Sequence, residues 1–228
     1  MEISVQLDMH KSTVLRMVST LMGEGYLKLN PDTRKYSLGT QSMRLGLSAY
    51  DNLSLRKVAE PVLKELANKT GFVIHLAIND RQNVVVVCKV FPDKRTFSID
   101  RSQVGGIIPT YCTGIGLLFL SQESDDFVRQ YLQGIERIPY TETTMTDVDS
   151  IVERVRKVRK DDYCINNGEH EAGIVSLCYP IRDRKGQVAA GLSVGNVREV
   201  VLRTDLEALG RLVRDSAQNI SRQLGYAD

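Results

Sequence analysis

The sequence has no apolar run long enough to cross a bilayer. Its longest such runs, Val84–Cys88 and Ile115–Leu120, fall far short of the ~20 residues that a membrane-spanning helix needs. The N-terminus also lacks a charged stretch followed by an apolar core, so no secretion signal is visible. From these two absences we expect a cytoplasmic protein with no membrane partner.

Cysteine is sparse, and the chain has no C-x-x-C pair. Because the spacing fits neither a zinc site nor a redox motif, we predict small buried side chains and no metal or cofactor. The four residues concerned are Cys88, Cys112, Cys164 and Cys178.

Catalytic motifs are absent as well. No G-x-S-x-G elbow surrounds a serine, and no G-x-x-x-x-G-K-[ST] phosphate loop occurs. A thiol hydrolase would have to combine Cys112, Cys164 or Cys178 with His75 or His170. A metal site would have to use Glu169 and Glu171 beside His170. We favour a charged surface loop for these three neighbours, and we expect no enzymatic activity.

Positive and negative charges are nearly balanced, because the chain has 30 Lys and Arg residues and 28 Asp and Glu residues, with a net charge of +2. Binding to nucleic acid would therefore need a local basic surface. The 228 residues, 42% of them hydrophobic, are enough for one large or two modest domains with a packed core.

The first fifty residues predict two helices followed by a β-hairpin. Helices are expected at 2–8 and 12–24, where Val14, Val18 and Leu21 recur at helical spacing and Gly25 ends the second helix. Leu15 and Met22 widen this apolar stripe. Apolar residues on both sides of the turn Pro31-Asp32 then indicate the hairpin.

Basic and hydroxylated residues gather at the start of the 12–24 helix and in the hairpin. A helix with such a start, followed directly by a basic hairpin, is the order of a winged helix-turn-helix, in which the helix enters a groove and the wing contacts the backbone. The alternative is a capped helix with solvated charges. The candidate DNA-binding residues are Lys11, Ser12, Thr13, Arg16, Ser19, Arg34 and Lys35.

The remaining chain predicts helices and antiparallel strands around one sheet, an α+β arrangement. Helices are expected at 41–50, 54–69, 113–121, 124–132, 147–160 and 199–224, the fifth starting with a capping box at Thr146 and Asp149, and the last burying Leu206. Strands are expected at 72–78, 83–90, 96–101, 174–181 and 187–195.

The stretch Thr113–Gly116, TGIG, allows two interpretations. Glycines at a helix start expose backbone N–H groups that could hold a carboxylate, or they let the helix pack closely against the sheet. The residues alone leave both open.

The chain resembles the IclR family of bacterial transcriptional regulators over nearly its whole length. The resemblance rests on KSTVLRMVSTLMGEGYL with YSLG, on VGGIIPTYCTGIGLLFL, on the approach to NNGEHEAGI and on YPIRDRKGQVAAGLSVG. It implies a winged helix-turn-helix domain at 1–40, which lacks the family's first helix, a linker helix at 41–52 and a GAF/PAS-like effector-binding domain at 53–228. Asp162 departs from the family, which commonly has glycine there, and Asn166 and Ser176 replace frequent acidic and cysteine residues.

The resemblance also implies a function and a pocket. We expect a repressor of a catabolic operon, binding a palindromic operator as a homodimer or homotetramer and responding to an organic acid. The alternative is a metabolite-binding module that has lost DNA binding. The pocket residues that carry over are Thr113, Gly114, Ile115, Asn166, Ile174, Ser176, Ser193 and Gly195, with Ile99 and Ile107 as expected apolar walls.

Overall fold

The computed structural model describes residues 2–51, 54–94 and 102–227. The chain divides into two compact units, Met1–Leu53 and Ser54–Asp228, each of which has its own architecture. The strand expected at 96–101, and with it Ile99, lies outside the described residues.

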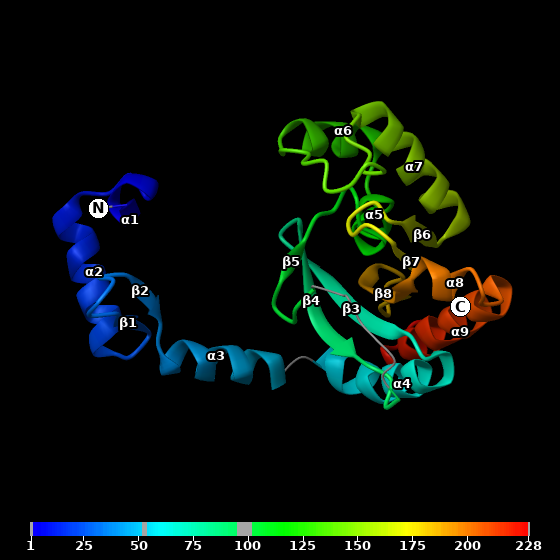
Figure 1. Ribbon diagram of the computed structural model, residues 1–228, viewed down its shortest axis with the longest axis horizontal. Helices are drawn as coiled ribbons and strands as arrows, with labels where there is room; N and C mark the ends of the chain where they lie inside the picture. Colours follow the sequence, from blue (N-terminus) through cyan, green and yellow to red (C-terminus); the bar gives the residue numbers. More distant parts are fainter. Residues whose placement is uncertain (1, 52–53, 95–101, 228) are drawn as a thin grey trace. The chain divides into compact units, whose positions relative to one another are not determined.

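The first unit contains the expected helices and hairpin (Figure 1). Its elements are α1 (Glu2–Gln6), α2 (Lys11–Gly23), β1 (Leu27–Leu29), β2 (Tyr36–Leu38) and α3 (Thr40–Asp51). Helix α2 starts one residue earlier than predicted, because the His10 ring nitrogen accepts a hydrogen bond from the Ser12 N–H at 3.4 Å and caps the helix. Gly25, at φ +74°, ends it as predicted.

The hairpin turn is built around one asparagine. The Asn30 side-chain oxygen accepts hydrogen bonds from the N–H groups of Asp32 and Thr33, both at 2.9 Å. Arg34 follows in the left-handed region, at φ +55°, and β1 and β2 pair antiparallel. The predicted wing is therefore present, with Arg34 and Lys35 exposed on it.

The apolar stripe of α2 is only partly buried. Val14 and Val18 are covered, but Leu15 is 54% and Leu21 41% exposed, and Met22 is exposed too. The apolar stripe therefore predicts burial correctly for Val14 and Val18 and wrongly for these three. Among the described residues of this unit, the short α1 and the small two-stranded sheet leave them uncovered.

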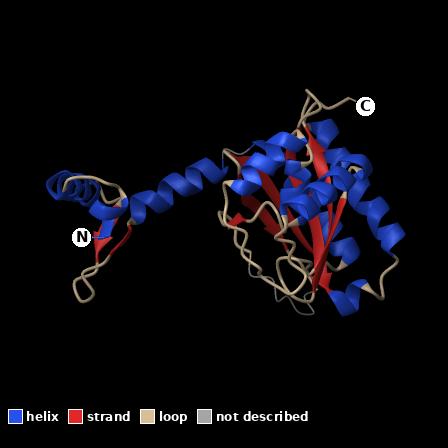
Figure 2. Cartoon of the chain, turned by 90° about the horizontal axis from the view of Figure 1, so that it is seen from above, coloured by secondary structure: helices blue, strands red, loops and turns tan. Residues whose placement is uncertain are grey.

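The second unit is built on one antiparallel sheet of six strands in the order β5-β4-β3-β8-β7-β6 (Figure 2). The strands are β3 (Val73–Asp80), β4 (Asn83–Val90), β5 (Ile107–Ile108), β6 (Cys164–Asn167), β7 (Ile174–Arg182) and β8 (Val188–Val197). Strands β3 and β8, far apart in sequence, pair at its centre. This is the expected α+β fold with a GAF/PAS-like sheet.

Helices cover both faces of this sheet. Helices α4 (Ser54–Thr70) and α9 (Leu206–Gln223) contact each other and pack on one face, while α5 (Gly114–Leu120) packs on the other, beneath α7 (Val148–Asp161) and α6 (Asp125–Gln133). Ile151, Val155 and Val158 of α7 are buried as predicted, together with α5 in one apolar core.

Three expectations about the helices of this unit were wrong. The terminal helix is divided into α8 (Arg198–Val201) and α9, because the Asp205 carboxylate caps a new helix by accepting from two backbone N–H groups at 3.0 Å. Leu206, the first residue of α9, is 46% exposed instead of buried. Asp147, and not Thr146, caps α7, accepting from the Ser150 N–H at 2.8 Å.

Candidate functional site

A cavity of about 110 Å³ lies between the sheet and the start of α5. Its floor consists of side chains that stand opposite one another on neighbouring strands. Ser193 of β8 pairs with His75 of β3 on one side and with Cys178 of β7 on the other. In the next row, Ser176 of β7 lies between Gly195 and Asn166. Strand register therefore assembles a polar floor from four strands.

The start of α5 forms one wall of the cavity. Thr113 caps the helix, its hydroxyl accepting a hydrogen bond from the Gly116 N–H at 3.2 Å. The first N–H groups of a helix have no carbonyl partner within it, so this end is suited to an acceptor such as a carboxylate. The Asn166 amide donates to the Cys112 carbonyl at 2.8 Å and joins β6 to this wall.

The glycines of this wall also serve packing. A Cβ atom on Gly114 would lie 2.4 Å from the Cys178 Sγ, and one on Gly116 would lie 2.3 Å from the Thr110 carbonyl oxygen. Only glycine allows these approaches. The close packing of TGIG against its neighbours is therefore confirmed. The binding of an anion by the N–H groups at this helix start stays a prediction.

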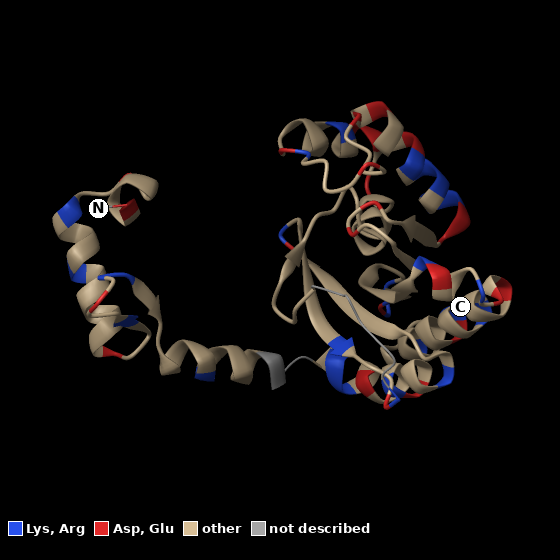
Figure 3. Cartoon of the chain, in the orientation of Figure 1, with Lys and Arg blue, Asp and Glu red and all other residues tan. Residues whose placement is uncertain are grey.

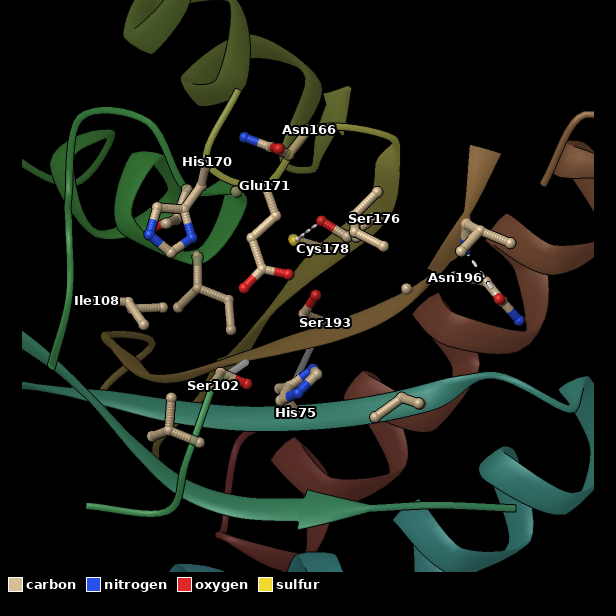
Figure 4. Close-up of a pocket in the computed structure, with 18 residues that line it drawn as sticks. His75, Ser102, Ile108, Asn166, His170, Glu171, Ser176, Cys178, Ser193 and Asn196 are labelled. Atoms are coloured by element: carbon tan, nitrogen blue, oxygen red, sulfur yellow. Dashed lines mark hydrogen bonds between the residues drawn. The ribbon is translucent and has the colours of Figure 1, made fainter. Parts of the chain in front are cut away.

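The loop between β6 and β7 lies over the cavity. Figure 4 shows the Glu171 carboxylate pointing into the cavity towards Ser193 and Cys178, and the His170 ring beside Ile108. His170 also makes an edge contact with Tyr140, with ring centroids 4.9 Å apart. The cavity thus combines a polar floor, a helix start and an acidic group on one side.

Hydrogen bonds from outside the sheet hold this loop. The hydroxyls of Thr141 and Thr143 donate to the Gly168 carbonyl at 2.7 Å and 3.0 Å, and that of Thr144 donates to the Glu169 carbonyl at 2.6 Å. The Glu169 side chain is 9% exposed and lies 3.6 Å from an Arg154 nitrogen. Burial raises the pKa of Glu169, and Arg154 opposes this.

The four cysteines are all buried and free, as predicted. Burial raises the pKa of Cys112 to about 12 and that of Cys178 to about 11, with the Ser193 hydroxyl opposing the latter shift. Burial raises the pKa of Cys164 and Cys88 as well. Thiols in this state are protonated at neutral pH and are poor nucleophiles.

The structure brings most of the predicted effector residues together. Eight line the cavity: Thr113, Gly114, Ile115, Asn166, Ile174, Ser176, Ser193 and Gly195. Ile107 does not line it. That side chain is 66% exposed, and Ile108, which points to the other face of β5, lines the cavity in its place.

Other lining residues were not among the expected ones. These are Val73, His75, Val86, Ser102, Ile108, His170, Glu171, Cys178, Asn196 and Val197. The signal that could have found part of this set is the period of two along each strand, which places His75 with Val73, Cys178 with Ser176, and Val197 with Gly195 and Ser193 on one face of the sheet.

The run from Glu169 to Glu171 is not the surface loop that we expected. Glu169 is only 7% exposed, and His170 and Glu171 are half-buried on the cavity. Within the described part of the chain, no cluster of three or more His, Cys, Asp or Glu side chains is arranged to hold a metal ion.

The candidate DNA-binding residues lie on the surface of the first unit. Lys11, Ser12, Thr13, Arg16 and Ser19 are exposed along α2, and Arg34 and Lys35 are exposed on the hairpin. Figure 3 shows basic residues on both elements. The Ser12 hydroxyl lies 2.8 Å from the His10 ring nitrogen, so it takes part in the cap as well.

In the described residues, no helix has the length and apolar character needed to cross a membrane. Two family models match the chain. One, described as bacterial transcriptional regulator IclR C-terminal, matches residues 47–222, and the other, described as IclR helix-turn-helix domain, matches residues 1–31.

Individual relatives agree with these matches. The HTH-type transcriptional regulator KdgR of Escherichia coli is 32% identical over 227 residues, which are 100% of this chain and 86% of KdgR. A crystal structure of an IclR transcriptional regulator from Alicyclobacillus acidocaldarius superposes with a TM-score of 0.81 at 28% identity, covering 98% of this chain and 89% of that one. The DNA-binding transcriptional repressor YiaJ of Escherichia coli is 24% identical, covering 96% of this chain and 78% of YiaJ.

Proposed function

The chain belongs to the IclR family of bacterial transcriptional regulators, and on that premise we propose that it is a repressor of a catabolic operon whose DNA binding responds to a small carboxylate. The observation that supports an acidic effector is the meeting of the α5 start with Ser176, Ser193 and Asn166 in one cavity. Unpaired helix N–H groups and neutral hydrogen-bond donors suit a carboxylate.

The acidic Glu171 side chain narrows this proposal. A carboxylate oxygen of Glu171 can accept a hydrogen bond from a ligand hydroxyl, so we propose that the ligand places its anionic group at α5 and a hydroxyl towards Glu171. Hydroxylated carboxylates, including sugar acids and hydroxybenzoates, satisfy both ends. The small cavity volume favours compact members of this class.

The DNA-binding surface that we propose is the start of α2 together with the wing. Arg16 reads base edges, Lys11 and the hydroxyls of Ser12 and Thr13 bind phosphates, Ser19 lies along the same groove, and Arg34 and Lys35 contact the backbone. The regulator acts as a homodimer or homotetramer on a palindromic operator. Effector binding favours one arrangement of the effector domains, and α3 transmits it by changing the spacing of the two α2 helices.

The DNA-binding part is tested by fluorescence anisotropy on DNA from the chain's own promoter region and on a random duplex, over a salt series. Arg16→Ala should weaken selective binding by about 1–3 kcal/mol, roughly 5- to 150-fold. Arg44→Ala removes the same charge from the same unit, on α3, and should bind within about twofold of wild type. Equal effects of the two variants would refute the placement of the recognition helix.

The effector part is tested by the loss of that anisotropy signal on addition of gluconate or 4-hydroxybenzoate. Ser193→Leu fills the cavity floor, so the response should disappear while DNA binding remains. Ser193→Ala, which removes only the hydroxyl, should weaken the response without abolishing it. A normal response in Ser193→Leu would place the effector elsewhere. Equally weak binding of wild type to both duplexes would favour the alternative, a metabolite-binding module without DNA binding.

A further inference from the structure

A second cavity lies on the opposite face of the strands that form the effector cavity. Along β7, Ser176 and Cys178 line the first cavity, whereas Val175, Leu177 and Tyr179 line the second. Alternation along a strand directs successive side chains to opposite faces, so the two cavities lie back to back across β7. The second has a volume of about 430 Å³, within the ~300–1,000 Å³ of small-molecule sites.

The second cavity is apolar inside and aromatic at one end. Its buried wall consists of Phe72, Leu177, Val194, Val201 and Leu209. Tyr163 and Tyr179 stand next to this wall with their rings stacked, 5.5 Å between centroids and 20° between planes. Stacked rings beside an apolar wall offer a flat ligand a matching surface.

The rim of the second cavity is basic. Arg211 and Arg214 of α9 line it together with a single carboxylate, that of Glu207. Glu207 pairs with Arg211 at 2.5 Å, whereas the carboxylate nearest Arg214 is 3.9 Å away, on Asp215. Among the lining side chains, Arg214 is therefore the cation that pairs with no lining carboxylate, and it lies beside the Tyr179 ring. Asp215 and Asp162, which do not line the cavity, offset part of its charge there.

A glycine inside α9 keeps this space open. Gly210 lines the cavity, and a Cβ atom there would lie 3.5 Å from the Tyr179 hydroxyl and 3.8 Å from a Leu177 methyl, which are ordinary contacts. Packing therefore does not require glycine. Glycine within a helix costs roughly 0.5–1 kcal/mol relative to alanine. A side chain larger than alanine would project into the cavity. Glycine at this position therefore keeps the cavity open, although the packing around it would accept alanine.

From this arrangement we propose that the second cavity, between α9 and β7, is a second ligand site, which takes a small aromatic anion. The ring lies against the Tyr163–Tyr179 stack and the apolar wall, and the negative group lies at Arg214. Ser176 lines both cavities, so the two sites share one residue, and any coupling between them acts equally in both directions.

The test uses 8-anilinonaphthalene-1-sulfonate, a fluorescent aromatic anion, with neutral N-phenyl-1-naphthylamine as its uncharged counterpart. The full chain should bind the sulfonate at one site per chain. Gly210→Leu should weaken that binding at least tenfold, while Gly210→Ala and Ser193→Leu should stay within about threefold. Arg214→Gln, a change of an exposed side chain, should weaken the sulfonate three- to tenfold and leave the neutral compound unchanged.

Four results would overturn the proposal. They are no binding of the sulfonate to the wild type, unchanged binding in both Gly210→Leu and Arg214→Gln, an equal loss in Ser193→Leu, and a change of oligomeric state in Gly210→Leu that parallels the loss of the dye. The last result would assign the second cavity to contact with a second copy of the chain. No DNA or effector enters these measurements, so they stand apart from the test of the proposed function.

Discussion

Replacing glycine by alanine should have opposite effects at two helix positions of the second unit. Gly116 lies in α5 and Gly210 lies in α9, and neither has a positive φ. Helix propensity alone predicts a gain at both. The surroundings of the two added Cβ atoms differ, and they should decide the sign.

At Gly116 the added atom would lie 2.3 Å from the Thr110 carbonyl oxygen and 2.4 Å from the Thr110 Cα. Both are backbone atoms, so no side-chain rotation relieves the overlap. Overpacking of this kind costs about 1–3 kcal/mol, and more when backbone must move, which exceeds any propensity gain. Subtracting the propensity gain of about 0.5–1 kcal/mol from a cost at the upper end of this range, we expect Gly116→Ala to lower the free energy of unfolding by about 1–2 kcal/mol.

At Gly210 the nearest atoms, the Tyr179 hydroxyl and a Leu177 methyl, are at ordinary contact distance. The propensity gain is then realised, and Gly210→Ala should raise the free energy of unfolding by about 0.5–1 kcal/mol. In a domain of this size 1 kcal/mol shifts the melting temperature by about 2–4 °C. The two variants should consequently melt on opposite sides of the wild type.

Thermal and urea unfolding, followed by circular dichroism, measure both variants under identical conditions. The urea slope should be the same for both, since the surface exposed on unfolding hardly changes. The reasoning would be refuted if Gly116→Ala were as stable as Gly210→Ala, because the backbone contact of α5 with Thr110 would then be unimportant.

Three further predictions concern single sites in the second unit. Asp162, at φ +57°, pairs with Arg182 at 2.6 Å. Asp162→Gly loses this ion pair but relieves backbone strain, so it should leave the free energy of unfolding nearly unchanged. Asp162→Ala loses the pair without relieving the strain, so it should lower the free energy of unfolding, measured in urea, by about 1 kcal/mol. The buried thiols should react with dithiobis(nitrobenzoate) at pH 8 only after unfolding. Burial holds the pKa of Glu169 above the ordinary value of 4.5. The folded state therefore gains stability as the pH falls through that raised pKa towards 4.5. Glu169→Gln should remove this part of the pH dependence of the free energy of unfolding.

The helices and the hairpin of the first unit could be predicted because their signals are local. The spacing of Val14 and Val18, the glycine at 25 and the turn at Pro31 each act within a few residues. Burial of Leu15, Leu21 and Met22 could not be predicted in the same way. Periodicity identifies an apolar face, but whether anything covers that face depends on other elements of the fold.

In the second unit the long strands and helices were predicted and the short ones were missed. Strands β5 and β6 have two and four residues, too few for an alternating pattern to stand out. The break between α8 and α9 was missed because the apolar spacing continues across it. Asp205 is the signal of a new helix start, but a single capping residue is a weaker signal than the apolar periodicity on both sides of it.

Most of the cavity residues that the family resemblance implied lie together. The residues beside them could be identified only from the strand pairing in the structure. His75 and Cys178 flank Ser193 only because β3, β8 and β7 pair in that register. A shift of one residue in any of these pairings would turn the side chains to the other face. Sequence spacing within one strand cannot fix a register between strands that lie more than a hundred residues apart.

The floor and the cover of the cavity beside α5 are held by different kinds of interaction. Continuous strand pairing and a buried apolar core fix the floor, whereas the cover over 168–173 depends on three threonine hydroxyls and on the imperfect Arg154–Glu169 pair. Local opening begins where few buried apolar contacts oppose it. The cover is therefore the part of the cavity wall that local opening reaches before the sheet.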